Sequence, residues 1–255
     1  MALASERRTF DIARDHFPVA SRHAKMVIDR IRSVRSLPAD AQILDIGSAQ
    51  GLFLIACAKL GYRAFGVEPD ATAREVGAQV AAEYGVDVTI VEGVAEALPV
   101  ESNSFDVVHA KSVVEHVVDV EAVFSEVYRV LRPGGVFWFN TASSMCPQQC
   151  EIRGFPAFGW YPNSLKRRVM DWAIAHRPEL IGHTSRPAYQ WFTPGKARRM
   201  LRAAGFTMVY DRWDLRGGNE GGRAYRAMLG FVRMNAATKT MADILVAGCS
   251  YAAIK

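Results

Sequence analysis

Short apolar stretches alternate with helix-like segments from residue 42 to residue 140, and this alternation limits the fold more than any other feature. Segments with apolar residues three or four positions apart separate the stretches, which indicates crossover helices. Parallel strands need such crossovers, so we expect a mostly parallel sheet with helices on both faces. The predicted strands in this region are residues 42–46, 63–68, 87–91, 105–110 and 136–140.

Two further strands are expected near the end of the chain, at residues 206–213 and 244–254, which makes seven in total. A helix at residues 20–35 precedes the first strand. Residues 141–162 show no periodicity, and a helix at 163–176 follows them, expected to bury Leu165, Val169, Trp172 and Ala173. The chain is therefore predicted to be a doubly wound α/β domain with a helical and irregular insertion after the fifth strand.

The composition narrows the class of protein. Half of the residues are hydrophobic and 22% are charged, which is typical of a globular chain rather than a disordered one. No apolar run approaches the roughly 18 residues that span a bilayer, so we expect no integral membrane segment. The first twenty residues are rich in charge, and the four cysteines are few and scattered. We therefore expect neither a secretory leader nor a disulfide framework nor a metal site, and a cytoplasmic protein.

The turn after the first strand is the strongest candidate for a binding site. Asp45 closes the strand, and Gly47 and Gly51 flank a tight turn into the next helix. In open α/β sheets, ligands bind beyond the carboxyl ends of the strands, and glycines allow them a close approach. Glu68, at the tip of the second strand, suits the two hydroxyls of a ribose. The spacing Asp-x-Gly-x-Ala-x-Gly is neither the dinucleotide fingerprint nor a P-loop, which argues against a nicotinamide dehydrogenase.

Three segments together resemble the class I S-adenosylmethionine-dependent methyltransferases: ILDIGSAQGLFLIACAKLGYRAFGVEPD, LPVESNSFDVVHAKSVVEHV and LRPGGVFWFN. The resemblance covers about residues 42–140 and is nearest to the quinone-biosynthesis and natural-product enzymes. It implies a Rossmann-like fold and S-adenosyl-L-methionine as the cofactor. The cofactor-binding residues that it implies are Asp45, Gly47, Ser48, Ala49, Gln50, Gly51, Glu68, Pro69, Val94, Ala95, Ala110 and Lys111.

The sequence departs from the family pattern at two of these positions. Ala49 stands where the family turn has its middle glycine, and we expect a slightly looser contact with the cofactor. Val94 stands where related sequences often have an Asp that meets the adenine amine. Adenine is then expected to be held by apolar packing and by the backbone of Val94 and Ala95.

Candidate catalytic residues follow the fourth strand and lie in the insertion. A sulfonium donor is already activated, so positioning supplies most of the acceleration, with a base needed only when the acceptor loses a proton. Glu115-His116 looks like a Glu-His pair of the ubiquinone O-methyltransferases, and His116 can accept a proton near neutrality. His183 belongs to an aromatic stretch that forms either an acceptor pocket or a small satellite core. Histidines 23 and 109 are expected to be structural.

These expectations divide a single domain of residues 1–255 into four parts. Residues 1–36 form an N-terminal lid and helix, with residues 10–17 ahead of the helix and folded over the cofactor. Residues 37–143 form the cofactor-binding core, and residues 144–192 the insertion on the acceptor side. Residues 193–255 complete the sheet and contain a second insertion at 216–240.

The charge is divided unevenly along the chain and leaves alternatives open. Residues 153–233 hold 15 Lys and Arg against 5 Asp and Glu, out of totals of 31 and 26. This excess indicates either an ordinary solvated surface or a contact with something anionic. The first hypothesis is methylation of an oxygen, nitrogen or carbon of a small, anionic or neutral metabolite. The alternatives are methylation of RNA or protein through the basic half, which no recognition module supports, and a non-catalytic cofactor-binding protein.

Overall fold

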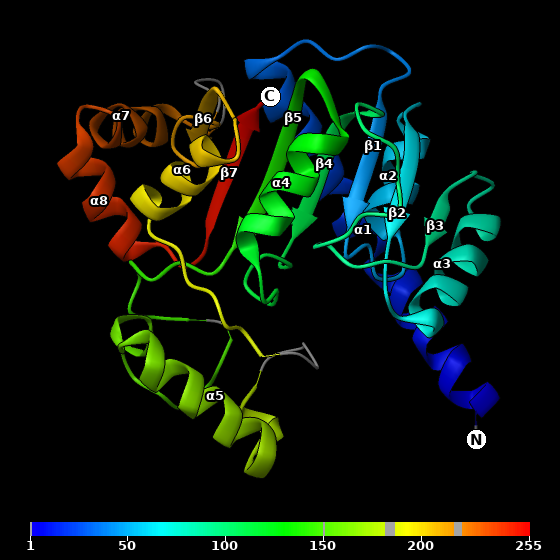
Figure 1. The fold of residues 1–255 in the computed structure, drawn as a ribbon, viewed down its shortest axis with the longest axis horizontal. Coiled ribbons are helices and arrows are strands. Elements are labelled where there is room, and N and C mark those ends of the chain that lie inside the picture. The colour runs from blue at the N-terminus through cyan, green and yellow to red at the C-terminus, as the bar shows by residue number, and fades with distance from the viewer. Residues whose placement is uncertain (1, 150, 182–186, 217–220) are drawn as a thin grey trace.

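A computed structural model describes residues 2–149, 151–181, 187–216 and 221–255. Its centre is one sheet in the order β3-β2-β1-β4-β5-β7-β6 (Figure 1). The pairs among β1 to β5 are parallel, and β7 runs antiparallel to both β5 and β6. The strands are β1 (Gln42–Ile46), β2 (Arg63–Val67), β3 (Thr89–Val91), β4 (Phe105–Lys111), β5 (Leu131–Thr141), β6 (Met208–Asp211) and β7 (Cys249–Ile254).

Helices cover both faces of the sheet, as the crossovers require. On one face, α1 (Ala2–Val34), α2 (Leu52–Lys59) and α3 (Ala71–Glu83) enclose a core with one side of β1 and β4. On the other, α4 (Val120–Val130) and α6 (Pro194–Ala203) enclose a second core. The strand order reverses between β1 and β4, so their carboxyl ends form the crevice where ligands of such sheets bind. The predicted seven-stranded, doubly wound α/β fold is confirmed.

The insertion lies beyond the carboxyl ends of β1 and β4 (Figure 1). It contains α5 (Asn163–His176) and the short 3₁₀ helices η1 (Phe158–Trp160) and η2 (Pro178–Leu180). It has a small core of its own. The predicted buried face of α5 is partly wrong, because Leu165 and Trp172 are exposed, whereas Lys166, Met170 and Ala173 are buried.

The N-terminal helix is longer than predicted. Residues 10–17, expected to form a lid ahead of the helix, are part of α1, which continues through Pro18. Phe17 is buried, and its ring lies 4.1 Å from that of Tyr84, at the end of α3. The apolar stripe of α1 thus extends further than the 20–35 pattern indicated, and burial against α2 and α3 outweighs the cost of an internal proline.

The end of the chain also differs from the expectation. The predicted insertion 216–240 contains α7 (Arg223–Val232) and the start of α8 (Ala236–Leu245), and β7 begins at Cys249 rather than at residue 244. A capping box at Asn235 starts α8, and Asp243 accepts a hydrogen bond from Trp213 Nε1 at 2.8 Å. These anchors hold residues 244 and 245 in the helix, although their apolar side chains are equally suited to a strand.

Candidate functional site

The turn between β1 and α2 has the backbone geometry that the glycine pattern predicted. Gly47 has φ +65° and Gly51 has φ +66°, in the left-handed region that favours glycine. A Cβ at Gly47 would lie 2.6 Å from Val113 Cγ2, and one at Gly51 would lie 2.7 Å from Ile90 Cδ1. Neither position therefore accepts a larger residue without rearrangement, because Val113 and Ile90 pack closely against the turn.

Ala49, the departure from the family pattern, also has a left-handed backbone, with φ 47°. Its N–H donates to Glu68 Oε2 at 2.8 Å, and the N–H of Asp70 donates to Glu68 Oε1 at 3.0 Å. These bonds hold the carboxylate at the tip of β2. Each carboxylate oxygen accepts two bonds, so the pair of oxygens keeps room for two hydroxyl donors.

Arg74 supports this carboxylate, and sequence reasoning missed it. Its Nη1 donates to the carbonyl oxygens of Glu68 and Pro69 at 2.8 and 2.9 Å, and its Nη2 pairs with Glu92 at 3.1 Å. The guanidinium thus fixes the backbone that carries Glu68. The only signal in the sequence is an Arg in the first turns of the predicted second helix, which is too common to single it out.

The remaining predicted cofactor residues gather around the same edge of the sheet. Val94 is 45% exposed, while Ala95 is buried beside it. Ala110 is buried at the end of β4, where it pairs with Ile46, and Lys111 is exposed. Ser48 is buried in the turn, whereas Gln50 and Pro69 are half-buried.

Asp45 lies beneath the turn and makes a contact that the sequence did not predict. Its Oδ1 lies 2.7 Å from Nδ1 of His109 on β4, and both residues are buried. His109 Nε2 in turn lies 3.3 Å from Nε2 of His23 on α1. Both histidines were expected to be structural, and the structure places them in a chain that ends at a predicted cofactor residue.

The Glu-His pair after β4 lies under the insertion. Glu115 is 5% exposed, and burial raises the pKa of its carboxyl to about 7. Its Oε2 has no hydrogen-bond partner among the described residues. Its carbonyl oxygen accepts bonds from the N–H groups of Tyr189 and Gln190 at 2.7 and 3.0 Å, which bring the end of the insertion onto the end of β4.

His116 is held by the same segment. Its Nδ1 lies 3.0 Å from the carbonyl oxygen of Pro187, which only accepts, so Nδ1 carries the proton and donates. In the neutral ring Nε2 is then the basic nitrogen, as a proton acceptor requires. The third candidate catalytic residue, His183, lies outside the described residues.

The aromatic residues of the insertion take part in packing. Trp191 is buried in the insertion's own core, as the satellite-core alternative expects, whereas Phe192 is buried in the main core of the sheet. Lys166 Nζ lies 4.8 Å from the centre of the Trp191 ring, and burial lowers the pKa of this lysine to about 8.

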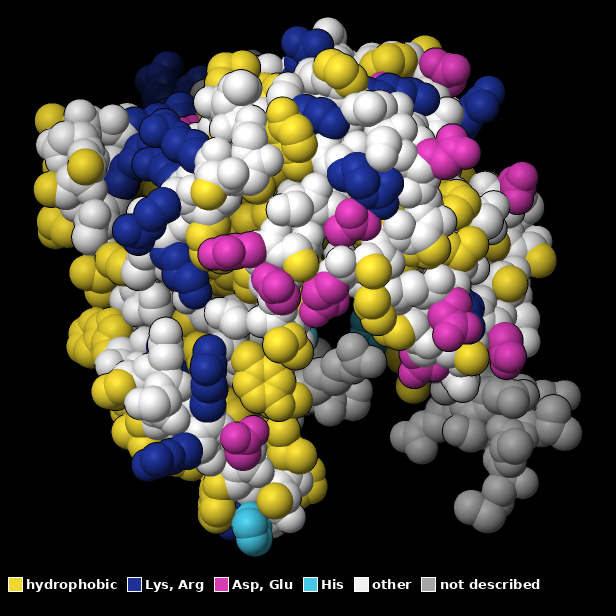
Figure 2. All heavy atoms as spheres, in the orientation of Figure 1, with side chains coloured by type: hydrophobic (Ala, Val, Ile, Leu, Met, Phe, Trp, Pro, Cys, Tyr) yellow, Lys and Arg dark blue, Asp and Glu magenta, His cyan; other side chains and the backbone are white. Residues whose placement is uncertain are grey.

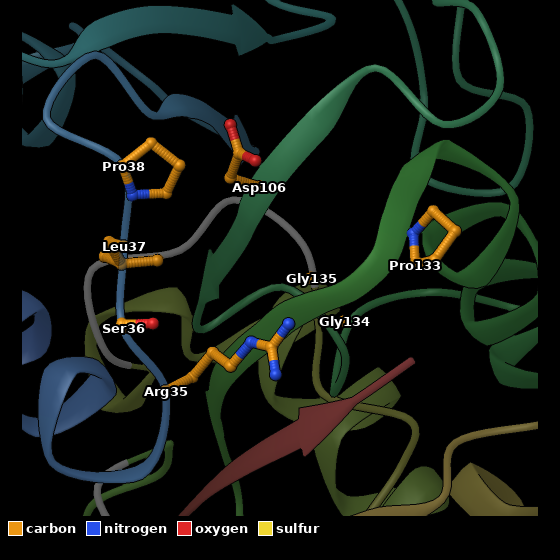
Figure 3. Close-up of a pocket in the computed structure, with 8 residues that line it drawn as sticks. All are labelled: Arg35, Ser36, Leu37, Pro38, Asp106, Pro133, Gly134 and Gly135. Atoms are coloured by element: carbon orange, nitrogen blue, oxygen red, sulfur yellow. The ribbon is translucent and has the colours of Figure 1, made fainter.

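Two hollows lie away from the turn. One of about 410 Å³ is at the opposite end of β4 and β5, where Arg35 faces Gly134 and Gly135 (Figure 3). Its acidic residue, Asp106, already pairs with Arg132 at 2.6 Å and accepts from the N–H of Gln42 at 2.8 Å. The other, of about 580 Å³, lies between Gln148, Gln149, residues 152–157 and Ala247, next to the start of β7.

Two features are absent from residues 2–149, 151–181, 187–216 and 221–255. No group of three or more His, Cys, Asp and Glu side chains there is arranged to hold a metal ion. None of the helices there combines the length and the apolar character that crossing a bilayer requires.

Comparisons with known proteins agree with the geometry of the turn. A family model described as a methyltransferase domain matches residues 44–139. The ubiquinone biosynthesis O-methyltransferase of Methylobacterium nodulans is 31% identical over 179 residues, which cover 69% of this chain and 64% of that relative. The chain therefore matches less than two thirds of that relative's length.

Solved structures show the same fold. An S-adenosylmethionine-dependent methyltransferase from Mesorhizobium loti has a TM-score of 0.58 at 16% identity, covering 88% of this chain and 95% of its own. The phosphoethanolamine N-methyltransferase 2 of Haemonchus contortus, in complex with S-adenosyl-L-methionine, has a TM-score of 0.56 at 18% identity, covering 89% and 51%. At these identities the likeness concerns the fold alone.

Proposed function

We propose that the chain is a class I S-adenosylmethionine-dependent methyltransferase and that it methylates a small molecule by direct in-line transfer. The observation that carries the proposal is the carboxylate of Glu68, held at the tip of β2 by the N–H groups of Ala49 and Asp70. A fixed carboxylate beside a glycine turn is suited to the two hydroxyls of a ribose.

The residues of the turn fit a nucleoside cofactor. Gly47 and Gly51 give the turn its left-handed backbone, and the fixed carboxylate of Glu68 would accept hydrogen bonds from the ribose. The exposed side chain of Val94 offers apolar contact to an adenine ring, which matches the lack of an Asp at this position. When bound, S-adenosylmethionine supplies a methyl group on a sulfonium, already activated for transfer. The protein's task is therefore to orient the acceptor and exclude water.

On the acceptor side we assign the proton chemistry to His116, with Glu115 beside it. Neutral His116 donates through Nδ1 to Pro187 and can receive an acceptor proton at Nε2. Glu115 fixes the segment that carries Pro187, because its carbonyl oxygen binds the N–H groups of Tyr189 and Gln190. The name of the Methylobacterium relative favours an oxygen acceptor.

Two substitutions test the cofactor side and the acceptor side of the proposed site independently. Glu68→Ala should weaken binding of S-adenosylhomocysteine by about 1 to 3 kcal/mol, as expected for loss of a charged hydrogen-bond partner. His116→Ala should leave that affinity intact and lower turnover about 100-fold, in the range for loss of a general base. Titration calorimetry measures the first effect, and methyl transfer from labelled cofactor to a panel of small phenols and amines measures the second.

Glu75→Ala, an exposed carboxylate on α3 near Glu68, is the matched control and should change neither quantity. Failure of the unaltered protein to bind S-adenosylhomocysteine at millimolar concentration would refute the assignment of the cofactor. Full turnover in the His116 variant would leave positioning as the only catalytic device. Binding without transfer to any acceptor would favour the non-catalytic alternative.

A further inference from the structure

Three polar side chains from three elements form a chain beneath the candidate cofactor turn. Asp45 stands on β1, His109 on β4 and His23 on α1, with 2.7 Å between Asp45 Oδ1 and His109 Nδ1. The two histidines meet through their Nε2 atoms at 3.3 Å. His109 is 1% exposed and Asp45 is 4% exposed, so these contacts are shielded from water.

The carboxylate determines the direction of one of the two hydrogen bonds. An ionised carboxylate only accepts, so His109 donates to Asp45 through Nδ1–H. Between the two Nε2 atoms there is one proton, which His23 donates to a neutral His109 or a protonated His109 donates to His23. Burial lowers the pKa of His23 to about 3, and nearby His109, Lys111 and Arg30 act in the same direction, which keeps His23 neutral near pH 7.

The ring of His109 has little freedom to turn. It stacks on Phe53 of α2 with 3.8 Å between ring centres and 12° between the planes. Its two nitrogens bind side chains from different elements. The hydrogen bond to Asp45 is therefore preorganised by packing, and the orientation of the Asp45 carboxylate follows from it.

The other oxygen of Asp45 remains for a ligand. Oδ2 accepts no hydrogen bond from the described residues. Asp45 stands two residues before Gly47, so this oxygen is at the carboxyl end of β1, where the turn begins. A carboxylate fixed in a site of low dielectric is a strong partner for a cation.

We propose that His109, supported by His23, is a positioning residue for the cofactor, which holds Asp45 so that Oδ2 receives the ammonium of the methionine part. The inference rests on the proposed function, since that cofactor carries the ammonium. It assigns to α1 a part in cofactor binding through His23, 86 residues away from its partner in the sequence.

Two ligands that share the same adenosine part test this role. S-adenosylhomocysteine carries the ammonium, whereas 5′-methylthioadenosine lacks the whole amino-acid part. His109→Gln, which retains no donor at the Nδ1 position, should bind S-adenosylhomocysteine about tenfold more weakly and bind 5′-methylthioadenosine within about twofold of the unaltered protein. His109→Asn, whose amide nitrogen occupies the Nδ1 position, should recover most of the lost affinity.

His23 gives a second pair of variants on a half-buried position. His23→Phe should show the same loss, selective for S-adenosylhomocysteine but about threefold, and His23→Gln, whose amide can donate or accept a hydrogen bond, should restore it. Equal loss of both ligands in the His109 variants would make the residue merely structural and overturn the inference, as would unchanged S-adenosylhomocysteine affinity. If the unaltered protein bound neither ligand, the proposed function itself would fail.

Discussion

At the scale of single residues, the candidate site combines residues that a sequence motif identifies with residues that no motif identifies. Gly47 and Glu68 belong to a local pattern, and their geometry agrees with it. His109 lies 64 residues from Asp45 along the chain, and only the pairing of β1 with β4 brings the two together. Such a contact leaves no periodic signal, because it depends on strand register rather than on spacing.

The buried carboxyl of Glu115 makes stability depend on pH. Burial raises its pKa from 4.5 to about 7, so the folded state binds the proton more tightly than the unfolded state. The stability that proton binding at Glu115 contributes is fully present below about pH 4.5 and is lost as the pH rises to about 7. Glu115→Gln, a mimic of the protonated form, should therefore raise the free energy of unfolding at pH 8 by on the order of 3 kcal/mol.

The measurement is urea unfolding at pH 5 and at pH 8, where the gain should be small at the lower pH and large at the higher one. Glu121→Gln, on the exposed first turn of α4, is the control and should show no such dependence. An equal effect of Glu115→Gln at both pH values would contradict a raised pKa for this group.

At the scale of elements, the start of α4 depends on one side chain and its nearest backbone groups. Oδ1 of Asp119 accepts the N–H groups of Glu121 and Ala122, both at 3.0 Å. The buried face of α5 was predicted wrongly in part, because Lys166 packs inward on Trp191 while Trp172 faces outward. A lysine stem covers apolar surface as well as many apolar side chains do, so hydropathy alone misplaces it.

The cap of α4 provides a test at this scale. Asp119→Ala removes two hydrogen bonds and a negative charge at the N-terminus of the helix, and should lower the free energy of unfolding by about 1 kcal/mol. Thermal and urea unfolding measure the change. Ser125→Ala, at an exposed position inside the same helix, should cost nothing. A cost for Ser125→Ala as large as that for Asp119→Ala would mean that the cap has no specific role.

At the scale of the whole molecule, part of the basic charge gathers at one place on the surface. Lys and Arg side chains gather over α6 (Figure 2), which carries Lys196, Arg198, Arg199 and Arg202. Some of this charge is already paired: Arg198 lies 2.7 Å from Asp211, and Lys239 pairs with Asp211 and Asp214. Arg198 is thus already paired within the protein, and the partners to be told apart for the remaining charge are a small-molecule acceptor and a nucleic acid.

Salt dependence decides between these partners. A surface that contacts several phosphates loses about 1,000-fold or more in affinity between about 50 and about 200 mM salt. We expect RNA to bind weakly with little change over this range, in a filter-binding or anisotropy measurement. Arg199→Gln with Arg202→Gln, which removes two exposed charges of α6, should not alter that result. A steep salt dependence that flattens in this variant would revive RNA methylation.

The amino-acid sequence by itself determined the alternation of strands and helices, the glycine turn after β1 and the acidic tip of β2. Each of these features depends on residues that are close together in the sequence, through their periodicity, their φ preference and their spacing. Only the tertiary structure decided that α1 runs unbroken from residue 2 to residue 34, that residues 244–245 remain helical, and that His23, His109 and Asp45 form one chain. Those outcomes depend on which distant surfaces are buried against one another, and burial of packed surface outweighs the small differences in local preference.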